Sequence, residues 1–543
     1  MKLYAIFLVP WIIAIFFGLP VISPNSDDIF YLLPAVGFAE HGILAVPLGD
    51  QQFWKILFNL PTYAFFQGII FSLINVADIP INFTTYRLPH SIIVLCFVLI
   101  SSLLLIKNSK SNTLSYRYFL PILFLGLLGL LPFVQVWPVF RPEPLGLVVF
   151  ISGFWLLEAG LIEDKIIKKS IPGSLLIGIS PTLHPLFAVV FALSMFTFTI
   201  KLLIDKKIFR ALYLTILSLI PLIILSSYVY LITPEAITVI QEQSTLATEG
   251  RRAFSGLFQR IHETVFTNFN WSKSVVSIYT LFFLILIFLF IFSSIIALKN
   301  IFLTSNNHDT SLNGFLIIGA SSLISLFFIF DFSYAHSTMS ALLLLSTIGL
   351  NKNIILKFFE KLPKQLKFFL LLTLFLTPLS WTILNYSKHI LKPEYYLKPD
   401  ALLKTLENRN VIFDNLFVIS HELAPIVIDK LIHPDKNKTY WLFPDVGQVL
   451  KNPKLEQFKV NFIDNKIDNS TSLWLTKSKN TSQGYSIISD GSLCISIDNA
   501  TQLNTGSYFV KIAEPQILYN SHRYKLIKGK RVKGICNVPR GNY

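Results

Sequence analysis

Charged residues are scarce in this sequence, and so is cysteine. Only 14% of the 543 residues are Asp, Glu, Lys or Arg, whereas soluble domains carry roughly 25%, so the chain is not soluble throughout. Three cysteines exclude a disulfide framework. Cys96 lies in an apolar run, and Cys494 and Cys536 lie in a polar tail. Whether the two tail cysteines form a disulfide is left open by the sequence. The chain also shows no internal repeat or low-complexity tract, so fibrous and disordered classes are excluded.

Apolar residues dominate what remains. They make up 53% of the chain, which includes 49 Phe and has a mean hydropathy of +0.59. Many recur in blocks of about 18 to 24 residues, the length that spans a hydrocarbon core of ~30 Å. The sequence therefore predicts a polytopic α-helical membrane protein with about eleven transmembrane helices, at residues 3–22, 89–106, 119–133, 144–160, 171–185, 186–204, 211–231, 275–298, 314–330, 337–350 and 368–386. The first segment has no small-x-small cleavage site, so we expect it to be a retained span.

The net charge of +15 is explained by topology, because the lysines and arginines gather in alternate loops. The basic loops are 107–118, 161–170, 205–210 and 351–367. Cytoplasmic loops carry such an excess, so the N-terminus is predicted to be cytoplasmic and no nucleic-acid partner is expected. The opposite, extracytoplasmic side then receives residues 23–88, 134–143, 232–274 and 331–336 and the tail from residue 387.

Two further segments complete the predicted organisation. Residues 53–77 are nearly apolar enough to span, but inserting them would invert every later loop, so they are predicted to form a helix in the membrane interface. Residues 1–386 form the predicted transmembrane domain, with 23–88 as its first extracytoplasmic loop, and 387–543 form a soluble extracytoplasmic domain of α/β or α+β type. Within the tail we expect strands at Val411–Ser420, Tyr440–Phe443 and Ser472–Thr476 and a helix at Glu422–Leu431.

Adjacent acids directly follow the first predicted span. Asp27 and Asp28 stand where the chain leaves the bilayer. A carboxylate at the mouth of a membrane cavity can accept a proton from an attacking hydroxyl or amine. Because Ser26 precedes them and a helix-like stretch follows, they can equally serve as favourable charges at a helix N-terminus. Both interpretations stay open at this point.

Other polar residues lie at the predicted outer boundary. Arg141 and Glu143 stand beside an apolar run, where an acid is costly unless it is paired or faces water; a local ion pair is the simpler interpretation. His184 and His336 occupy outer-face turns, where a histidine satisfied by its surroundings is commoner than a ligand. A divalent metal is conceivable there, although no dedicated ligand spacing is present.

Adjacent arginines in the long outer loop 232–274 are unusual, since the positive-inside bias disfavours them there. The guanidinium forks of Arg251 and Arg252 suit the phosphate of a lipid-linked donor. Contact with anionic headgroups or with solvent is an equally good interpretation.

The first outer segment resembles that of the GT-C glycosyltransferases. It contains Asp27, Asp28, Tyr31, Gly42 and Pro47, and Arg87 precedes the second span. This order is similar to the branch that holds protein O-mannosyltransferases and lipid A aminoarabinose transferases, although the second acid there is Glu. The resemblance implies that Asp27 is the catalytic acid and extends to Arg141-Pro142-Glu143, His184-Pro185 and Tyr334-Ala335-His336. It covers about residues 1–386.

The resemblance implies a membrane glycosyltransferase of hexosyl- or pentosyl-transferring type. Such an enzyme moves a sugar from a polyprenyl-phosphate donor to a glycolipid, polysaccharide or protein acceptor with inversion, on the outer face of the plasma membrane. Whether the enzyme needs a divalent metal as a cofactor is left open by the sequence. The alternatives are a flippase of lipid-linked intermediates, which the lack of an inverted repeat disfavours, and an oligosaccharide ligase or polymerase. The absence of a Trp-Trp-Asp string argues against an oligosaccharyltransferase of the N-glycosylation type.

Overall fold

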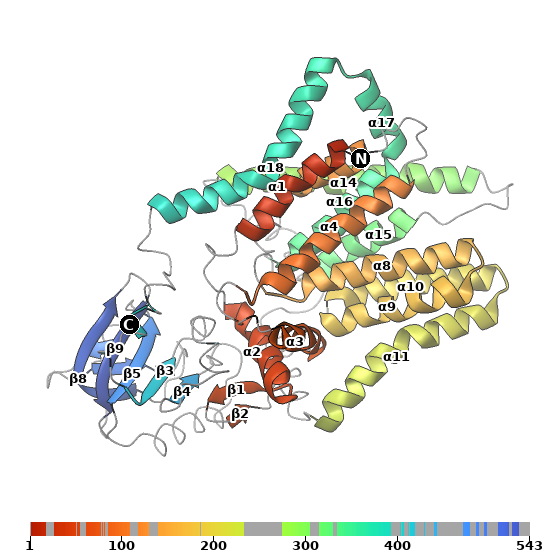
Figure 1. Ribbon diagram of the computed structural model, residues 1–543. Helices are drawn as coiled ribbons and strands as arrows, with labels where there is room; N and C mark the ends of the chain where they lie inside the picture. The colour runs from red at the N-terminus through yellow and green to blue at the C-terminus, as the bar shows by residue number, and fades with distance from the viewer. Residues whose placement is uncertain are drawn as a thin grey trace, which may run out of the picture. The chain divides into compact units, whose positions relative to one another are not determined.

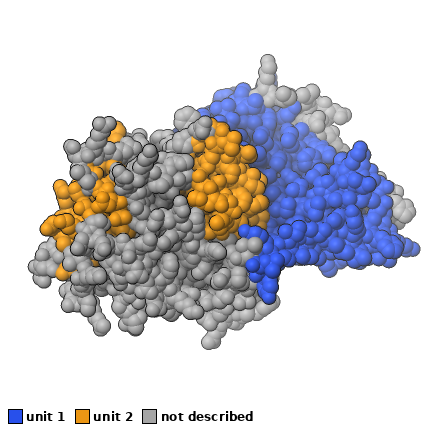
Figure 2. All heavy atoms as spheres, turned by 60° about the horizontal axis from the view of Figure 1, so that its bottom comes forward, with its two compact units in different colours: residues 1–19, 88–232, 248–384 blue, residues 20–87, 233–247, 385–543 orange. Residues whose placement is uncertain are grey.

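A computed structural model describes a large part of the chain. The described residues are 2–17, 26–49, 52–54, 61–77, 79, 81, 85–108, 118–129, 140–184, 186–232, 274–303, 314–328, 334–391, 402, 404–406, 411, 413–418, 428, 439–442, 471–477, 485–487, 493–496, 509–520 and 524–531. The chain divides into two compact units, which Figure 2 distinguishes by colour. Unit 1 holds residues 1–19, 88–232 and 248–384, and unit 2 holds residues 20–87, 233–247 and 385–543. The division of the chain at residue 386 into transmembrane and soluble domains stays a prediction.

Unit 1 is helical. Its elements are α1 (Lys2–Phe17), α4 (Leu88–Asn108), α6 (Phe119–Leu128), α8 (Glu143–Ile162), the π-helix η1 (Ile166–Ser170), α9 (Ile171–Leu183), α10 (Leu186–Ile204), α11 (Ile208–Ile232), α14 (Ser274–Leu303), α15 (Gly314–Phe328), α16 (Tyr334–Leu350), α17 (Lys352–Lys361) and α18 (Lys364–Leu391), the last of which runs past the border of the unit. Helices α8, α9 and α10 lie side by side (Figure 1).

Each predicted transmembrane segment overlaps one of these helices, and parts of the segments 3–22, 119–133 and 314–330 lie outside the described residues. Among the described residues, four helices are long and apolar enough to cross a membrane: Leu88–Lys107, Glu143–Ile162, Leu186–Ile204 and Ile208–Leu231. A fifth is counted if α16 and α17, which meet at a bend of 69°, are taken as one broken span. Shorter apolar helices lie at Tyr4–Phe16, Pro61–Val76, Phe119–Leu128, Leu284–Leu298 and Gly314–Ser325. The chain is thus a helical membrane protein, and the number of eleven spans stays a prediction.

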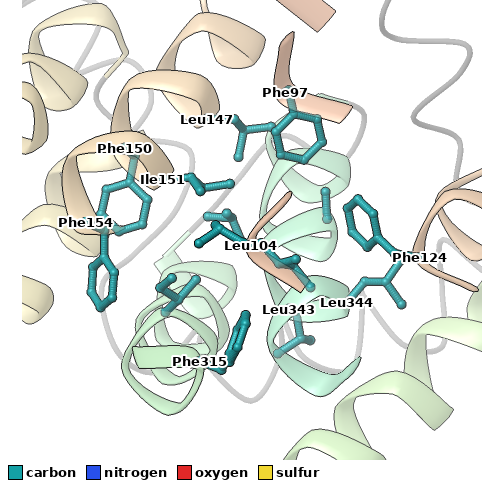
Figure 3. Close-up of a cluster of buried hydrophobic side chains, with 14 of the residues drawn as sticks. Phe97, Leu104, Phe124, Leu147, Phe150, Ile151, Phe154, Phe315, Leu343 and Leu344 are labelled. Atoms are coloured by element: carbon teal, nitrogen blue, oxygen red, sulfur yellow. The ribbon is translucent and has the colours of Figure 1, made fainter. Parts of the chain in front are cut away.

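The core of unit 1 is a layer of phenylalanine and leucine side chains. Figure 3 shows Phe97 and Leu104 of α4, Phe150 and Phe154 of α8, and Leu343 of α16 gathered in it. Polar contacts also join the described helices. The Trp11 indole N–H donates to the Leu125 carbonyl oxygen at 3.2 Å, and the Thr377 hydroxyl donates to the Gly126 carbonyl at 2.7 Å. Such bonds satisfy the buried donors of α1 and α18 and fix both helices against α6.

Unit 2 contains a helix pair and two sheets. Its described elements are α2 (Ser26–His41), β1 (Val46–Gly49), β2 (Gln52–Trp54), α3 (Pro61–Val76), β3 (Asn415–Val418), β4 (Thr439–Leu442), β5 (Thr471–Lys477), β6 (Tyr485–Ile487), β7 (Leu493–Ser496), β8 (Phe509–Asn520) and β9 (Tyr524–Arg531). Strands β1 and β2 pair with each other as a small antiparallel sheet. The predicted helix over 53–77 is shorter in the structure, because Gln52–Trp54 is a strand and the helix starts at Pro61, a residue suited to a first helical turn.

The larger sheet has the order β4-β3-β5-β9-β8-β7-β6. Strand β3 pairs in parallel with β4 and β5, and the remaining pairs are antiparallel. Phe417 and Trp474 are opposed in register, and their rings stack at 4.4 Å. The three strands expected in the tail are β3, β4 and β5. The expected helix 422–431 lies outside the described residues except at Ile428.

Candidate active site

The adjacent acids lie at the start of α2. This helix begins at Ser26, so Asp27 and Asp28 fall in its first turn. Negative charge there is favoured by the helix dipole and by the free backbone N–H groups. Their side chains are outside the described residues. The helix thus places both acids together at one end of α2, as the sequence predicts.

Helix α3 holds α2 along its length. The Tyr31 ring packs edge-on against the Tyr63 ring at 5.4 Å. One turn further, a Cβ atom on Gly68 would lie 2.9 Å from the Ala35 carbonyl oxygen, so only glycine permits this approach. Near the other end, the Asn75 amide donates to the Glu40 carboxylate. The contacts run in the same order along both helices, which are therefore parallel, and the helix of the two acids is fixed by its neighbour.

A buried polar cluster lies at the start of α8. Glu143 is 1% exposed and begins the helix after Pro142. The Arg141 guanidinium grips its carboxylate, with Nε at 2.9 Å from Oε1 and 3.1 Å from Oε2, and Nη2 at 2.6 Å from Oε1. Such a fork holds both groups in one geometry. The local ion pair that the sequence allowed is therefore present.

His184 approaches the same carboxylate. It ends α9 in an extended conformation, which is the conformation that a following proline favours. The Leu186 backbone N–H donates to His184 Nδ1 at 3.2 Å, so in the neutral ring the proton is on Nε2. Nε2 lies 3.8 Å from Glu143 Oε1. Glu143 thereby orients two donor groups, Arg141 and His184, at one end of the α8–α10 bundle.

A second histidine joins this end of unit 1, and sequence reasoning missed it. His90 is fully buried near the start of α4, and its ring lies 6.0 Å from that of Phe140, the neighbour of Arg141. Its position near the start of a long apolar helix could have identified it, because burying a polar side chain in a membrane segment costs free energy and such residues are often functional.

Arg87, in unit 2, is also buried. Its guanidinium carbon lies 5.0 Å from the centroid of the Tyr86 ring, in cation–π range. The predicted substrate-binding role of Arg87 stays a prediction.

The remaining predicted residues have side chains outside the described part of the chain, so their roles stay predictions. Arg251 and Arg252 lie outside the described residues. Tyr334 and His336 belong to the first turn of α16, with side chains that are also outside them. In the part of the chain that the structure describes, no three His, Cys, Asp or Glu side chains are grouped to hold a metal.

The fold of the chain is similar to that of a solved structure, ArnT from Cupriavidus metallidurans bound to undecaprenyl phosphate. The match covers 96% of this chain and 97% of that chain, with a TM-score of 0.52 and 9% sequence identity. At this identity the likeness concerns the fold. The sequence itself matches no family model and no curated protein.

Proposed function

We propose that the protein is a glycosyltransferase that uses a polyprenyl-phosphate-linked sugar. The observation that carries this proposal is the shared fold with ArnT over nearly the whole of both chains, because that neighbour was solved with undecaprenyl phosphate bound. The acceptor is an envelope glycolipid, polysaccharide or protein. Transfer takes place on the extracytoplasmic face of the plasma membrane, with the N-terminus in the cytoplasm, and it moves a hexose or a pentose.

In this proposal Asp27 is the general base. It takes the proton of the acceptor hydroxyl or amine, whose oxygen or nitrogen then forms the new bond to the anomeric carbon. The bond from that carbon to the phosphate oxygen breaks, and the phosphate leaves with the electron pair, so the configuration inverts. The placement of Asp27 and Asp28 in the first turn of a helix held by α3 supports this role, because a base must be fixed within hydrogen-bond reach of its proton.

The departing phosphate gathers negative charge, and cations placed beforehand contribute several kcal/mol at that point. We assign this task to Arg251 and Arg252, whose guanidinium forks match phosphate oxygens. The buried cluster of Arg141, Glu143 and His184 serves the polar part of the substrate: Glu143 holds the two donors in place, and they donate to substrate oxygens. Arg87, Tyr334 and His336 are further proposed substrate-binding residues, and His90 is added to them.

The experiment is mass spectrometry of envelope glycolipids, polysaccharides and glycoproteins from a deletion strain. We expect one sugar to be missing from one acceptor. Complementation with the wild-type gene restores it, and Asp27→Asn does not. A flippase would instead leave the whole intermediate on the wrong side, so every sugar of that glycan would be lost together. Restoration by the variant that lacks both Asp27 and Asp28 would overturn the mechanism.

A further inference from the structure

A short helix with two chemically different sides follows α16. Helix α17 starts after Asn351 and bends away from α16 by 69°. It leads through Leu362 and Pro363 into α18, and Figure 1 shows α17 and α18 as consecutive arms of a hairpin. Five lysines and one glutamate lie between residues 352 and 367. From the sequence, residues 351–367 are predicted only as a basic loop.

The apolar side of α17 is wider than the face that packs on the protein. Phe359 is 9% exposed and stacks on Phe119, with ring centroids 3.6 Å apart, and Ile355 packs beside it against the core. With 3.6 residues per turn, Ile354 and Phe358 lie next to this face. They are 60% and 63% exposed. A strip of apolar surface therefore runs along α17 outside its contact with the bundle.

Unneutralised lysines line the other edge of this strip. On the helical wheel, Lys357 and Lys361 follow Ile354 and Phe358, and Lys364 stands just after the turn; all three are exposed. Among the described residues none of the three has an ion-pair partner. Lys367 differs, because it donates to the Glu360 carbonyl and lies 5.4 Å from the Phe359 ring centroid.

In another basic segment, at residues 161–170, two of the three lysines pair with an acid. Lys165 and Lys169 both bind Glu163, at 2.9 and 2.5 Å, and Arg210 binds Asp164. The hydrogen bonds from Lys169 and Lys165 lower the pKa of Glu163 to about 2, so that this acid is charged at neutral pH. Lys357, Lys361 and Lys364 differ from Lys165, Lys169 and Arg210, which have such acidic partners.

We propose that α17 lies in the plane of the membrane interface and binds the headgroups of anionic phospholipids. Ile354 and Phe358 enter the boundary of the acyl chains, and Lys357, Lys361 and Lys364 contact the phosphates. An amphipathic helix with lysines beside its apolar face lies ~5–10 Å deep in this boundary, and each lysine near an anionic surface strengthens attachment about fivefold. Helix α17 thus anchors the turn between α16 and α18 to the lipid surface.

The experiment places a bimane fluorophore at Phe358→Cys in the full chain, with Cys96, Cys494 and Cys536 replaced by serine. The protein is reconstituted in nanodiscs of phosphatidylcholine and phosphatidylglycerol in which either lipid is brominated. We expect brominated phosphatidylglycerol to quench the fluorophore at least threefold more than brominated phosphatidylcholine. Bromine near the headgroup should quench more than bromine at the chain end, because the helix is shallow.

Two controls separate headgroup binding from general immersion. Lys357→Gln with Lys361→Gln and Lys364→Gln should abolish the preference, whereas Lys165→Gln with Lys169→Gln should leave it unchanged. Ile167 is 79% exposed and lies between Lys165 and Lys169, which pair with Glu163. A fluorophore at Ile167→Cys should show no preference for brominated phosphatidylglycerol. Equal quenching by both lipids at Phe358, a preference that survives the triple variant, or stronger quenching from the chain end would overturn the proposal. No transfer activity enters these measurements.

Discussion

Glu143 illustrates how one buried residue organises several others. Its carboxylate is gripped by Arg141 and faced by His184, and the side chains of Glu143 and Arg141 are 2% and 13% exposed. Removing one member of a buried pair leaves the other charge without compensation. We expect Glu143→Ala to lower the free energy of unfolding by about 3 kcal/mol, measured by denaturant unfolding in detergent.

The exposed pair of Arg210 and Asp164 offers the matched comparison. Asp164 is 69% exposed, so solvent screens the pair, and Arg210→Ala should change stability by less than ~1 kcal/mol. If Glu143→Ala proves as mild as Arg210→Ala, the cluster is not the organising contact that its geometry indicates.

At the proposed phosphate contact, charge and shape can be separated by a conservative change. Arg251→Lys or Arg252→Lys keeps the charge but removes the bidentate fork. We expect lower kcat for transfer from a polyprenyl-phosphate sugar if the fork acts in the transition state, and higher KM alone if it binds substrate and transition state equally. Wild-type values of both constants in both variants would move the phosphate role to Arg141 or another cation.

At the scale of elements, close helix packing depends on small residues. A Cβ atom on Gly178 of α9 would overlap the Ser218 carbonyl oxygen of α11, and a backbone atom cannot move aside as a side chain can. We expect Gly178→Ala to destabilise the protein by roughly 1–3 kcal/mol. Thermal unfolding in detergent measures this, with Ile223→Leu as a neutral control, because that side chain of α11 is 60% exposed. Equal midpoints for both variants would contradict the packing.

The helices were more predictable than the residues between them. Long runs of Leu, Ile and Phe mark each span, because the bilayer selects for length and apolarity. The strands β3 and β5 followed from short β-branched and aromatic runs. The sequence did not predict the 69° bend at Asn351 or the helix at residues 352–361. The many lysines of this segment indicated a basic loop, although its apolar residues recur with a helical period. The contact of His184 with Glu143 joins residues that are 41 positions apart, which only the packing of α9 on α8 brings together.

At the scale of the whole molecule, the alternation of basic loops predicts one orientation. Reporter fusions at Asn108, Lys207 and Asn353 should report the cytoplasm, and a fusion at Tyr543 should report the opposite side. Each fusion point lies in or beside a lysine-bearing segment or at the chain end. A cytoplasmic reading at Tyr543 would mean that the predicted number of spans is wrong by an odd number.

The release of the lipid carrier tests the proposed reaction most directly. Purified protein is mixed with donor lipids and acceptor extracted from the host envelope, and free polyprenyl phosphate is measured by mass spectrometry. We predict that the wild-type protein releases it and that Asp27→Asn slows release ~10²–10⁴-fold, whereas loss of a helix cap alone would cost only about 1 kcal/mol of stability. Release at the wild-type rate by the variant lacking both Asp27 and Asp28 would contradict the account.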